Sequence, residues 1–232
     1  MLAARGVDPC TEYGVALAVE DFVPCVLAGA ALVVLALMVR GRVPKAFPVA
    51  ILGAVAITVG GVAKATWKLL VASGCWNYPI LENLLFPCIA FGFAAMSWSL
   101  LSAVKGRLVL AWPFAALPVG AAIGAIWMGD TWPLLIAAAV GASFFGVTAA
   151  VTAFRAGKKS VGWIFVLYTL GTNIMPPLAA QPVQSEAIQW AEQLTNSGIQ
   201  LCFLLGALWL REYLTTQSTA KAADAAKTGV PA

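Results

Sequence analysis

Seven apolar stretches, separated by short connections that hold most of the charge, constrain this chain more than any other feature. A hydrocarbon core about 30 Å thick requires roughly 20 apolar residues for each helical crossing. The stretches lack the alternation of apolar and polar residues that strands of a membrane barrel show. The sequence therefore predicts an all-α polytopic membrane protein with seven transmembrane helices. Within several residues at each end, these are 20–40, 46–72, 79–104, 107–128, 131–154, 161–180 and 185–213.

Charge is scarce in this chain. Of the 232 residues, 10% are charged and 61% are hydrophobic, whereas a soluble domain carries about 25% charged residues because its surface faces water. The expected solvent and first partner is therefore the lipid bilayer. Trp76, Trp127 and Trp209, near predicted helix ends, fit the aromatic belts of membrane proteins. The basic residues form short clusters between apolar runs rather than one stripe, so no nucleic-acid partner is expected.

The distribution of charge predicts the orientation through the positive-inside rule. Alternate connections and the C-terminal tail hold eleven of the 14 basic residues and two acids. The opposite side, with the adjoining helix ends, holds eight acids and three basic residues. We therefore expect an extracytoplasmic N-terminal tail (1–19), a seven-helix domain (20–213) in the inner (plasma) membrane and a cytoplasmic tail (214–232). The Ala-, Thr- and Lys-rich composition of that last tail predicts disorder.

A weak internal repeat relates the first three predicted helices to the last three at an offset of 110 residues. The two sets run in the same directions across the membrane, with the 107–128 helix between them. This pattern predicts a 3+1+3 parallel repeat, as occurs in membrane transporters, and chance similarity between apolar helices is the alternative. The matched positions are Glu82-Asn83-Leu84 with Glu192-Gln193-Leu194, Gly61 with Gly171, and Phe93 with Phe203.

Charged residues within the predicted helices gather near their extracytoplasmic ends. Such residues are costly in lipid and usually face the bundle interior or a cavity. Lys64 and Lys68 share one face of the 46–72 helix, and Gly60-Gly61 below them allows close approach of a neighbouring helix. At 1.5 Å rise per residue, Lys64 lies about 9 Å and Glu192 about 6 Å below the outer boundary. We expect these two to form an intramembrane ion pair, and Lys68 to pair with Glu82 at the rim.

Amide and hydroxyl side chains add to this group. Four amides of the 185–213 helix recur at a 4-3-4 spacing, which places them on one stripe. Pro176-Pro177 is expected to break or kink the outer turn of the 161–180 helix. The prediction is an outward-facing ligand-binding pocket between the 46–72, 79–104, 161–180 and 185–213 helices. Its candidate residues are Lys64, Lys68, Glu82, Asn83, Thr172, Asn173, Gln189, Glu192, Gln193 and Asn196.

Two structural readings of the same residues stay open. Lys68 and Glu82, which are near helix ends, can extend to the interface, and the amides can hold neighbouring helices together.

Cys10 and Cys75 fall on the same, oxidising side of the predicted topology. A disulfide between them and two free thiols are both compatible with the sequence. The remaining cysteines lie within predicted helices and are read as small packing residues.

The chain contains no histidine. This absence excludes a histidine-ligated haem, a Ser-His-Asp triad and histidine zinc sites. No cysteine pair has metal-ligand spacing and no glycine-rich loop resembles a phosphate-binding loop. We therefore expect no metal and no cofactor, and any chemistry would rest on Glu, Asp, Lys or Cys.

One segment has a family resemblance. It contains Trp67-Lys68-Leu69-Leu70, Gly74-Cys75-Trp76 and Pro79-Ile80-Leu81-Glu82-Asn83-Leu84-Leu85-Phe86. It resembles the helix 2–3 segment of bacterial lycopene cyclases, a family with a repeated three-helix unit and a glutamate pair before Leu-Phe-Phe. Here Glu82-Asn83 and, in the second copy, Glu192-Gln193 stand in place of that pair. The resemblance implies an intramembrane enzyme acting on an isoprenoid, and the departure falls on its proposed catalytic acid.

The sequence thus favours a transporter or membrane sensor that binds a small molecule or ion, rather than an enzyme. A sensor would need a cytoplasmic partner, because the sequence shows no kinase or nucleotide-binding domain, and this favours transport slightly. The first alternative is an intramembrane enzyme acting on an isoprenoid or lipid with Glu82 or Glu192 as general acid. The second is a structural membrane subunit. A homo-oligomer is compatible with all of these.

Overall fold

The computed structural model describes Cys10, residues 13–179 and residues 185–228, and it describes side chains for Cys10, 13–175 and 185–217. All regular structure in these ranges is helical, which confirms the predicted all-α class. Each predicted helix corresponds to one element or to two consecutive ones. The elements are α2 (Val15–Glu20), α3 (Phe22–Arg42), η1 (Pro44–Ala46), α4 (Phe47–Gly74), α5 (Pro79–Asn83), α6 (Leu85–Lys105), α7 (Trp112–Met128), α8 (Trp132–Arg155), α9 (Lys159–Ala179) and α10 (Glu186–Thr228).

Four helical segments of the described chain are long and apolar enough to cross a membrane. They are Val15–Arg42, Pro44–Gly74, Pro79–Lys105 and Trp132–Arg155. Helix α7 is apolar but has 17 residues, about 25 Å at 1.5 Å per residue. Large apolar side chains are exposed along these helices, including Val26, Leu52 and Ile126 at 66%, 67% and 84%. A surface of this kind fits lipid rather than water, so the fold is that of a membrane protein.

Local sequence sets where the helices begin and end. Proline occupies the first turn of α4, α5, α7 and α8, where the missing N–H has no helical acceptor in any case. Gly106 and Gly129 end α6 and α7 in the left-handed conformation, each with φ of 66°. Glycine tolerates that backbone without a Cβ clash. The connections are consequently short, and consecutive long helices run antiparallel.

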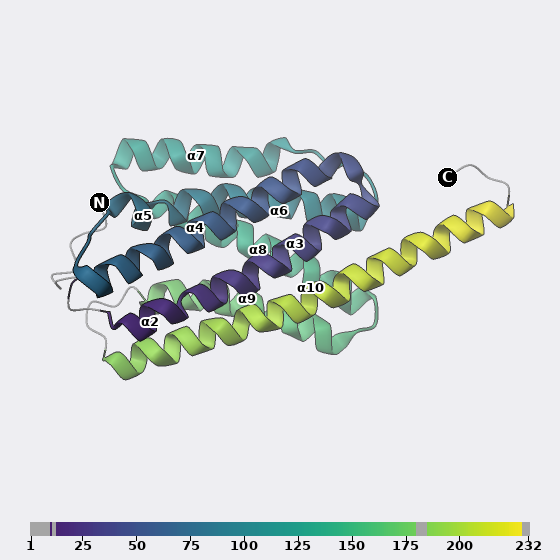
Figure 1. Cartoon of the computed structure of the whole chain (residues 1–232). Coiled ribbons are helices and arrows are strands. Elements are labelled where there is room, and N and C mark those ends of the chain that lie inside the picture. Colours follow the sequence, from purple (N-terminus) through teal and green to yellow (C-terminus); the bar gives the residue numbers. More distant parts are fainter. Residues whose placement is uncertain (1–9, 11–12, 180–184, 229–232) are drawn as a thin grey trace.

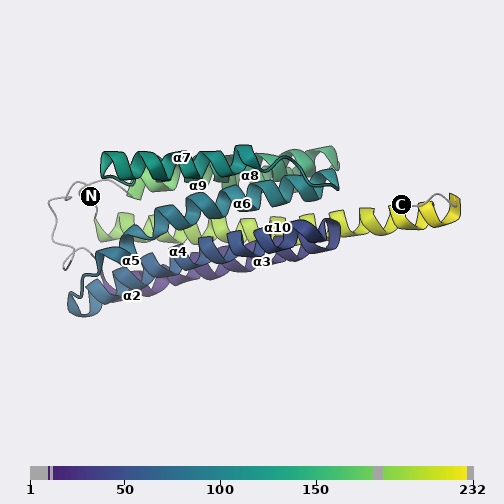
Figure 2. The same cartoon turned by 90° about the horizontal axis from the view of Figure 1, so that it is seen from above.

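Six long helices form a ring (Figures 1 and 2). Going around it, α3 packs on α4, α4 on α6, α6 on α8, α8 on α9, α9 on α10, and α10 again on α3. Helix α7 lies outside the ring, against α6 and α8. As a result, α3 lies between α4 and α10. Of the four helices that were expected to surround one pocket, α4 packs on α6 and α9 packs on α10, with α3 and α8 between these two pairs around the ring. A pocket shared by all four stays a prediction.

The middle of the ring is filled by aromatic side chains. Phe145 of α8 lies between Phe93 of α6 and Phe203 of α10, with ring centroids 6.2 and 5.8 Å away. Tyr168 of α9 stacks on Phe203 at 4.3 Å. Phe145, Phe203 and Tyr168 are at most 1% exposed. Edge-on and offset contacts of this kind stabilise a core beyond the area they bury, so the two ends of the bundle are separated by a packed layer.

Two details of α9 and α10 differ from the predictions. Helix α9 continues past Pro176 and Pro177 to Ala179, so the prolines do not break it, and it ends shortly after them. Helix α10 continues past Tyr213 to Thr228 and projects beyond the bundle (Figure 1), where the sequence predicted a disordered tail. The physical reason is that the segment is rich in Ala, which has the highest helix propensity, and it extends a helix whose nucleus already exists.

Arg42 joins three helices at the end of α3. Its Nε donates to the carbonyl of Ala103 in α6 at 3.3 Å, and its Nη1 donates to the carbonyl of Leu214 in α10 at 3.2 Å. Hydrogen bonds from a charged group each contribute about 1.5–3 kcal/mol. The side chain therefore fixes this end of the bundle while α10 runs past it.

Replacing Arg42 by methionine is expected to lower the free energy of unfolding by about 2–3 kcal/mol, because two carbonyls lose a charged donor. The measurement is thermal melting of the detergent-purified protein. Arg40→Met is the matched control, because Arg40 is exposed and lies 5.5 Å from the Phe47 ring centroid, a contact worth about 0.5–1 kcal/mol at a surface. Equal losses in both variants would contradict the role given to Arg42.

Candidate functional site

Polar side chains from three helices meet at the end of the bundle that holds the α2–α3 junction. We call Glu20, Asp21, Lys68, Gln193 and Ser197 the Glu20 cluster. Glu20 ends α2, Asp21 lies between α2 and α3, Lys68 belongs to α4, and Gln193 and Ser197 belong to α10. Because α3 packs between α4 and α10, its outer end contacts a basic helix on one side and a helix carrying amides and hydroxyls on the other.

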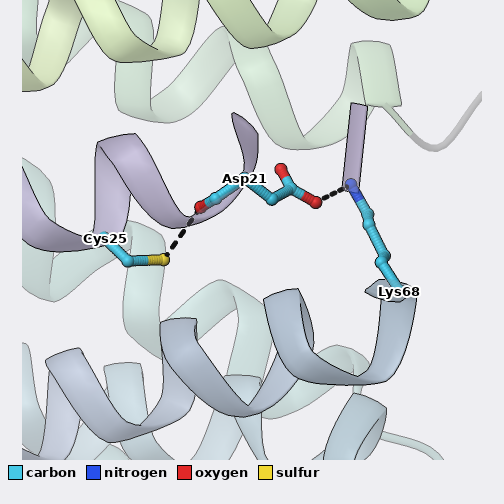
Figure 3. Close-up of polar contacts among 3 residues, drawn as sticks. All are labelled: Asp21, Cys25 and Lys68. Atoms are coloured by element: carbon cyan, nitrogen blue, oxygen red, sulfur yellow. Dashed lines mark hydrogen bonds and ion pairs between the residues drawn. The ribbon is translucent and has the colours of Figure 1, made fainter. Parts of the chain in front are cut away.

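Asp21 and Lys68 form the ionic half of the cluster (Figure 3). The Lys68 Nζ lies 2.5 Å from Asp21 Oδ2, with the two side chains 17% and 12% exposed. The same Nζ lies 5.2 Å from the centroid of the Tyr13 ring, and Tyr13 packs edge-on against Trp67 at 6.0 Å. Lys68 therefore pairs with Asp21 and not with Glu82, which corrects the predicted rim pair. The sequence prediction did not include Asp21 among the candidate residues, because it considered charges near the outer ends of other helices.

Glu20 forms the second half of the cluster with α10. The hydroxyl of Ser197 donates to Glu20 Oε1 at 2.5 Å. The other carboxylate oxygen, Oε2, is buried and has no hydrogen-bond partner. No lysine or arginine in the described part of the chain pairs with Glu20. A carboxylate that leaves water without a cation is costly unless another group compensates its charge, so Glu20 is the atypical residue of this structure.

Gln193 lies one turn before Ser197 on the same face of α10 and is 8% exposed. Its Nε2 is buried without a hydrogen-bond acceptor in the described residues. Gln189, another turn earlier, is 9% exposed. Gln189 and Gln193 of the predicted amide stripe therefore face inward, as expected, and they lie on the same side of α10 as Ser197, which bonds Glu20. An open acceptor on Glu20 and an open donor on Gln193 are uncommon, because buried polar groups are normally hydrogen-bonded.

The remaining candidate residues are distributed over several places. Asn173 Nδ2 donates to Ser143 Oγ of α8 at 2.9 Å and to the Thr169 carbonyl at 2.8 Å, which is the interhelical role that was left open. The Thr172 hydroxyl donates to the Thr169 carbonyl at 3.0 Å, and Asn196 accepts from Gln200 at 3.4 Å. These residues thus bond within and between helices, and none of these bonds reaches the Glu20 cluster.

Lys64 and Glu192 are both half-buried, on α4 and α10. The ring places α3 between these two helices, so their backbones do not adjoin, and the predicted ion pair between them stays a prediction. Gly60 and Gly61 do allow close packing, as expected. A Cβ on Gly60 would lie 2.6 Å from Cys88 Cβ of α6, and one on Gly61 would lie 3.0 Å from Cys25 Sγ of α3.

Glu82 and Asn83 lie in α5, away from the amide stripe. Asn83 borders an open groove of about 420 Å³ between α5–α6, α7 and α8, together with Asp130 and Thr131. Asp130 Oδ1 accepts from the backbone N–H of Trp132 at 3.2 Å, which helps to begin α8. The residues that line this groove include none of the Glu20 cluster. Helix α5 packs on α4, and the grouping of Glu82 and Asn83 with the other candidate residues stays a prediction.

A disulfide joins Cys10 to Cys75, with 5.0 Å between their Cα atoms and a sequence separation of 65. Cys75 ends α4 with a left-handed backbone, φ 56°. Nearby, the Trp67 indole N–H donates to Asn77 Oδ1 at 2.9 Å. The disulfide therefore fixes the N-terminal segment to the α4–α5 connection, beside the ionic half of the cluster.

Removal of this disulfide by Cys10→Ser is expected to lower the free energy of unfolding by about 2–4 kcal/mol, because the cross-link restricts the unfolded chain. Cys10 is the better position to change, since Cys75 also has the left-handed backbone at the end of α4. The measurement is thermal melting without reductant. Dithiothreitol should lower the melting temperature of the wild type and leave that of Cys10→Ser unchanged. An unchanged melting temperature in the variant would contradict this stabilising role.

The described residues contain no group of three or more Cys, Asp or Glu side chains arranged to hold a metal ion. The Glu20 cluster instead offers a carboxylate oxygen, an amide N–H and an ion pair. No family model, curated protein or solved structure shows significant similarity to this chain. Function must therefore be inferred from the site itself.

Proposed function

We propose that the chain crosses the inner (plasma) membrane seven times, with its N-terminus outside the cytoplasm and its C-terminus inside. Two independent features support this orientation. The basic connections predict one end as cytoplasmic, and the Cys10–Cys75 disulfide lies at the other end, as expected for an oxidising compartment. A phosphatase fused after Thr228 should be inactive and a fluorescent protein fused there should fluoresce. The opposite pair of results would reverse the orientation.

The ring is also compatible with the proposed parallel repeat. An offset of 110 pairs α3 with α8, α4 with α9 and α6 with α10, and it leaves α7 outside, where the structure has it. Six of the eight buried residues of α3 have buried counterparts in α8. The pairs are Pro24 with Leu134, Ala31 with Gly141, Leu32 with Ala142, Leu35 with Phe145, Ala36 with Gly146, and Val39 with Ala149. Parallel repeats of three helices occur in membrane transporters.

The proposed function is transport of a small polar molecule or ion, with the Glu20 cluster as its extracytoplasmic binding site. The observation that carries it is the half-buried Glu20 carboxylate, whose buried Oε2 has no hydrogen-bond partner and which has no cationic partner among the described residues. Ionisable groups in a membrane bundle that have no structural partner mark functional sites. Along α2 and α3, Glu20 lies about 33 Å from Arg42. This separation is close to the thickness of the hydrocarbon core and supports a position of Glu20 at its extracytoplasmic edge.

The aromatic layer gives transport a structural basis. The aromatic layer lies between the Glu20 cluster and the basic end of the bundle, and it consists of Phe93, Phe145, Tyr168 and Phe203. A solute bound at the cluster would therefore be accessible from one side of the membrane only. Transporters move one repeat against the other around a site near their interface. Here α2–α3 and α10, which share the Glu20–Ser197 bond, belong to different repeats.

Transport is tested by the uptake of labelled solutes into vesicles that contain the purified protein, with Glu20→Gln as the comparison. A solute that accumulates unmodified in wild-type vesicles only supports the proposal. Chemical conversion of a lipid would favour the intramembrane enzyme. Binding without uptake would favour a sensor. If no solute accumulates, binds or is converted, the structural subunit is the better account.

A further inference from the structure

We infer that the ligand of the Glu20 cluster carries a protonated amine next to a hydrogen-bond acceptor; this inference rests on the proposed function of the same site. Two of the four buried side-chain polar atoms without a hydrogen-bond partner among the described residues belong to this cluster. Glu20 Oε2 is an acceptor that receives no donor from these residues, and Gln193 Nε2 is a donor that finds no acceptor among them. A ligand that satisfies both must itself donate at one position and accept at a nearby one.

The charges of the site decide the nature of the donor. Asp21 is compensated by Lys68 at 2.5 Å, whereas the neutral hydroxyl of Ser197 is the only side-chain donor that Glu20 receives from the described residues. A neutral donor on the ligand would leave the carboxylate charge uncompensated in a half-buried site. A protonated amine compensates it, and charge-assisted hydrogen bonds are about twice as strong as neutral ones. The open position at Glu20 therefore fits an ammonium N–H.

The helix geometry decides how close the acceptor must be. Ser197, which bonds Glu20, and Gln193 are separated by one turn on the same face of α10, about 6 Å along the axis. The Glu20 carboxylate is thus held against one turn of α10 by Ser197, and the Gln193 amide lies on the preceding turn of the same face. A hydroxyl, carbonyl or phosphate oxygen two or three bonds from the amine spans this interval. Amino alcohols and aminoethyl phosphates have this chemistry.

Two sources can supply such a group, a free amino alcohol or the headgroup of phosphatidylethanolamine in the outer leaflet. The soluble arm of the test compares 2-aminoethanol with three analogues by calorimetric titration of the detergent-purified protein. Ethylamine lacks the acceptor, ethylene glycol lacks the charge, and choline lacks an N–H donor. The lipid arm compares melting temperatures in nanodiscs of phosphatidylcholine with and without phosphatidylethanolamine.

The expected order of affinity is 2-aminoethanol first. Ethylene glycol and choline should bind about tenfold or more weakly, since a charge is not compensated or a charge-assisted hydrogen bond is lost, and ethylamine about two- to tenfold more weakly, since a neutral hydrogen bond to Gln193 is lost. The Gln193→Met variant should bind 2-aminoethanol only as tightly as it binds ethylamine. Its affinity for ethylamine should equal that of the wild type. Glu20→Gln should abolish the preference for an amine over ethylene glycol. Stabilisation by phosphatidylethanolamine alone, lost in both variants, supports the lipid source.

Preferred binding of ethylene glycol or of an anion such as glycolate, if it still depends on Glu20 or Gln193, would overturn the amine inference and leave the binding site in place. Binding of no compound in either arm, together with no hit in a wider solute library, would overturn the proposed function as well. Glu82→Gln is the control variant, because Glu82 is a half-buried carboxylate outside the cluster, and its 2-aminoethanol affinity should equal that of the wild type.

Discussion

Gly53→Leu is expected to lower the free energy of unfolding by about 3 kcal/mol, because it overfills the contact between α4 and α6. A Cβ at this position would lie 2.9 Å from the backbone carbonyl oxygen of Gly92 and 3.0 Å from Ala95 Cβ. The nearest atom belongs to the backbone and cannot rotate away, so the two helices must separate. Helices in membranes associate through close packing of such small residues.

The measurement is thermal melting, with yield from the membrane fraction as a second readout. Gly120→Leu is the matched control, because a Cβ on Gly120 meets no atom within 4 Å and the change improves helix propensity by nearly 1 kcal/mol. The control should melt at or above the wild-type temperature. If Gly53→Leu melts at the same temperature as Gly120→Leu, the close approach of α4 and α6 is not a determinant of stability.

The second large effect concerns Glu20. In Glu20→Gln, we expect ligand affinity and uptake to fall by at least about tenfold, since a charged acceptor is replaced by a neutral one. We also expect the melting temperature of the ligand-free protein not to fall. The amide keeps an acceptor for Ser197, and it removes a half-buried charge that has no cationic partner. Loss of function without loss of stability is typical of binding sites that evolve at a cost in stability.

The opposite combination would identify a structural role. If Glu20→Gln melts well below the wild type and uptake declines only with protein abundance, Glu20 serves to hold α2 on α10. Asp21→Asn provides the contrast, because Asp21 is compensated by Lys68. That variant should lose stability, since Lys68 would be left half-buried without its carboxylate.

The helices were the most predictable part of the fold. Apolar runs of sufficient length, proline at Pro48, Pro79 and Pro133 and glycine at Gly106 and Gly129 locate most of the element ends. These signals are local, so sequence alone reveals them. The continuation of α10 to Thr228 was missed because the prediction relied on the polar composition of the segment. It did not consider that a segment directly after a helix can extend that helix without a new nucleation step.

The candidate site was only partly predictable. Gln189 and Gln193 face inward as their spacing indicated, because spacing on one helix fixes which residues share a face. The prediction of which segment Lys68 contacts was wrong. Lys68 was assigned to Glu82, which is near in sequence, whereas the fold brings Asp21 to it. Which helices adjoin depends on the ring order, and nothing in the hydropathy pattern specifies that order. Consecutive acids at positions 20 and 21, at the start of an apolar run, were the available signal.

The central claim is that the Glu20 cluster binds a ligand, and the most direct measurement is thermal melting of wild type and Glu20→Gln against one library of soluble solutes and lipids. A ligand that binds only the folded state stabilises it by about 2.7 kcal/mol at a hundredfold excess over its dissociation constant. We predict that at least one amine-bearing compound raises the melting temperature of the wild type and not that of Glu20→Gln. The claim is contradicted if no compound shifts the wild type, or if every compound that does so shifts Glu20→Gln equally.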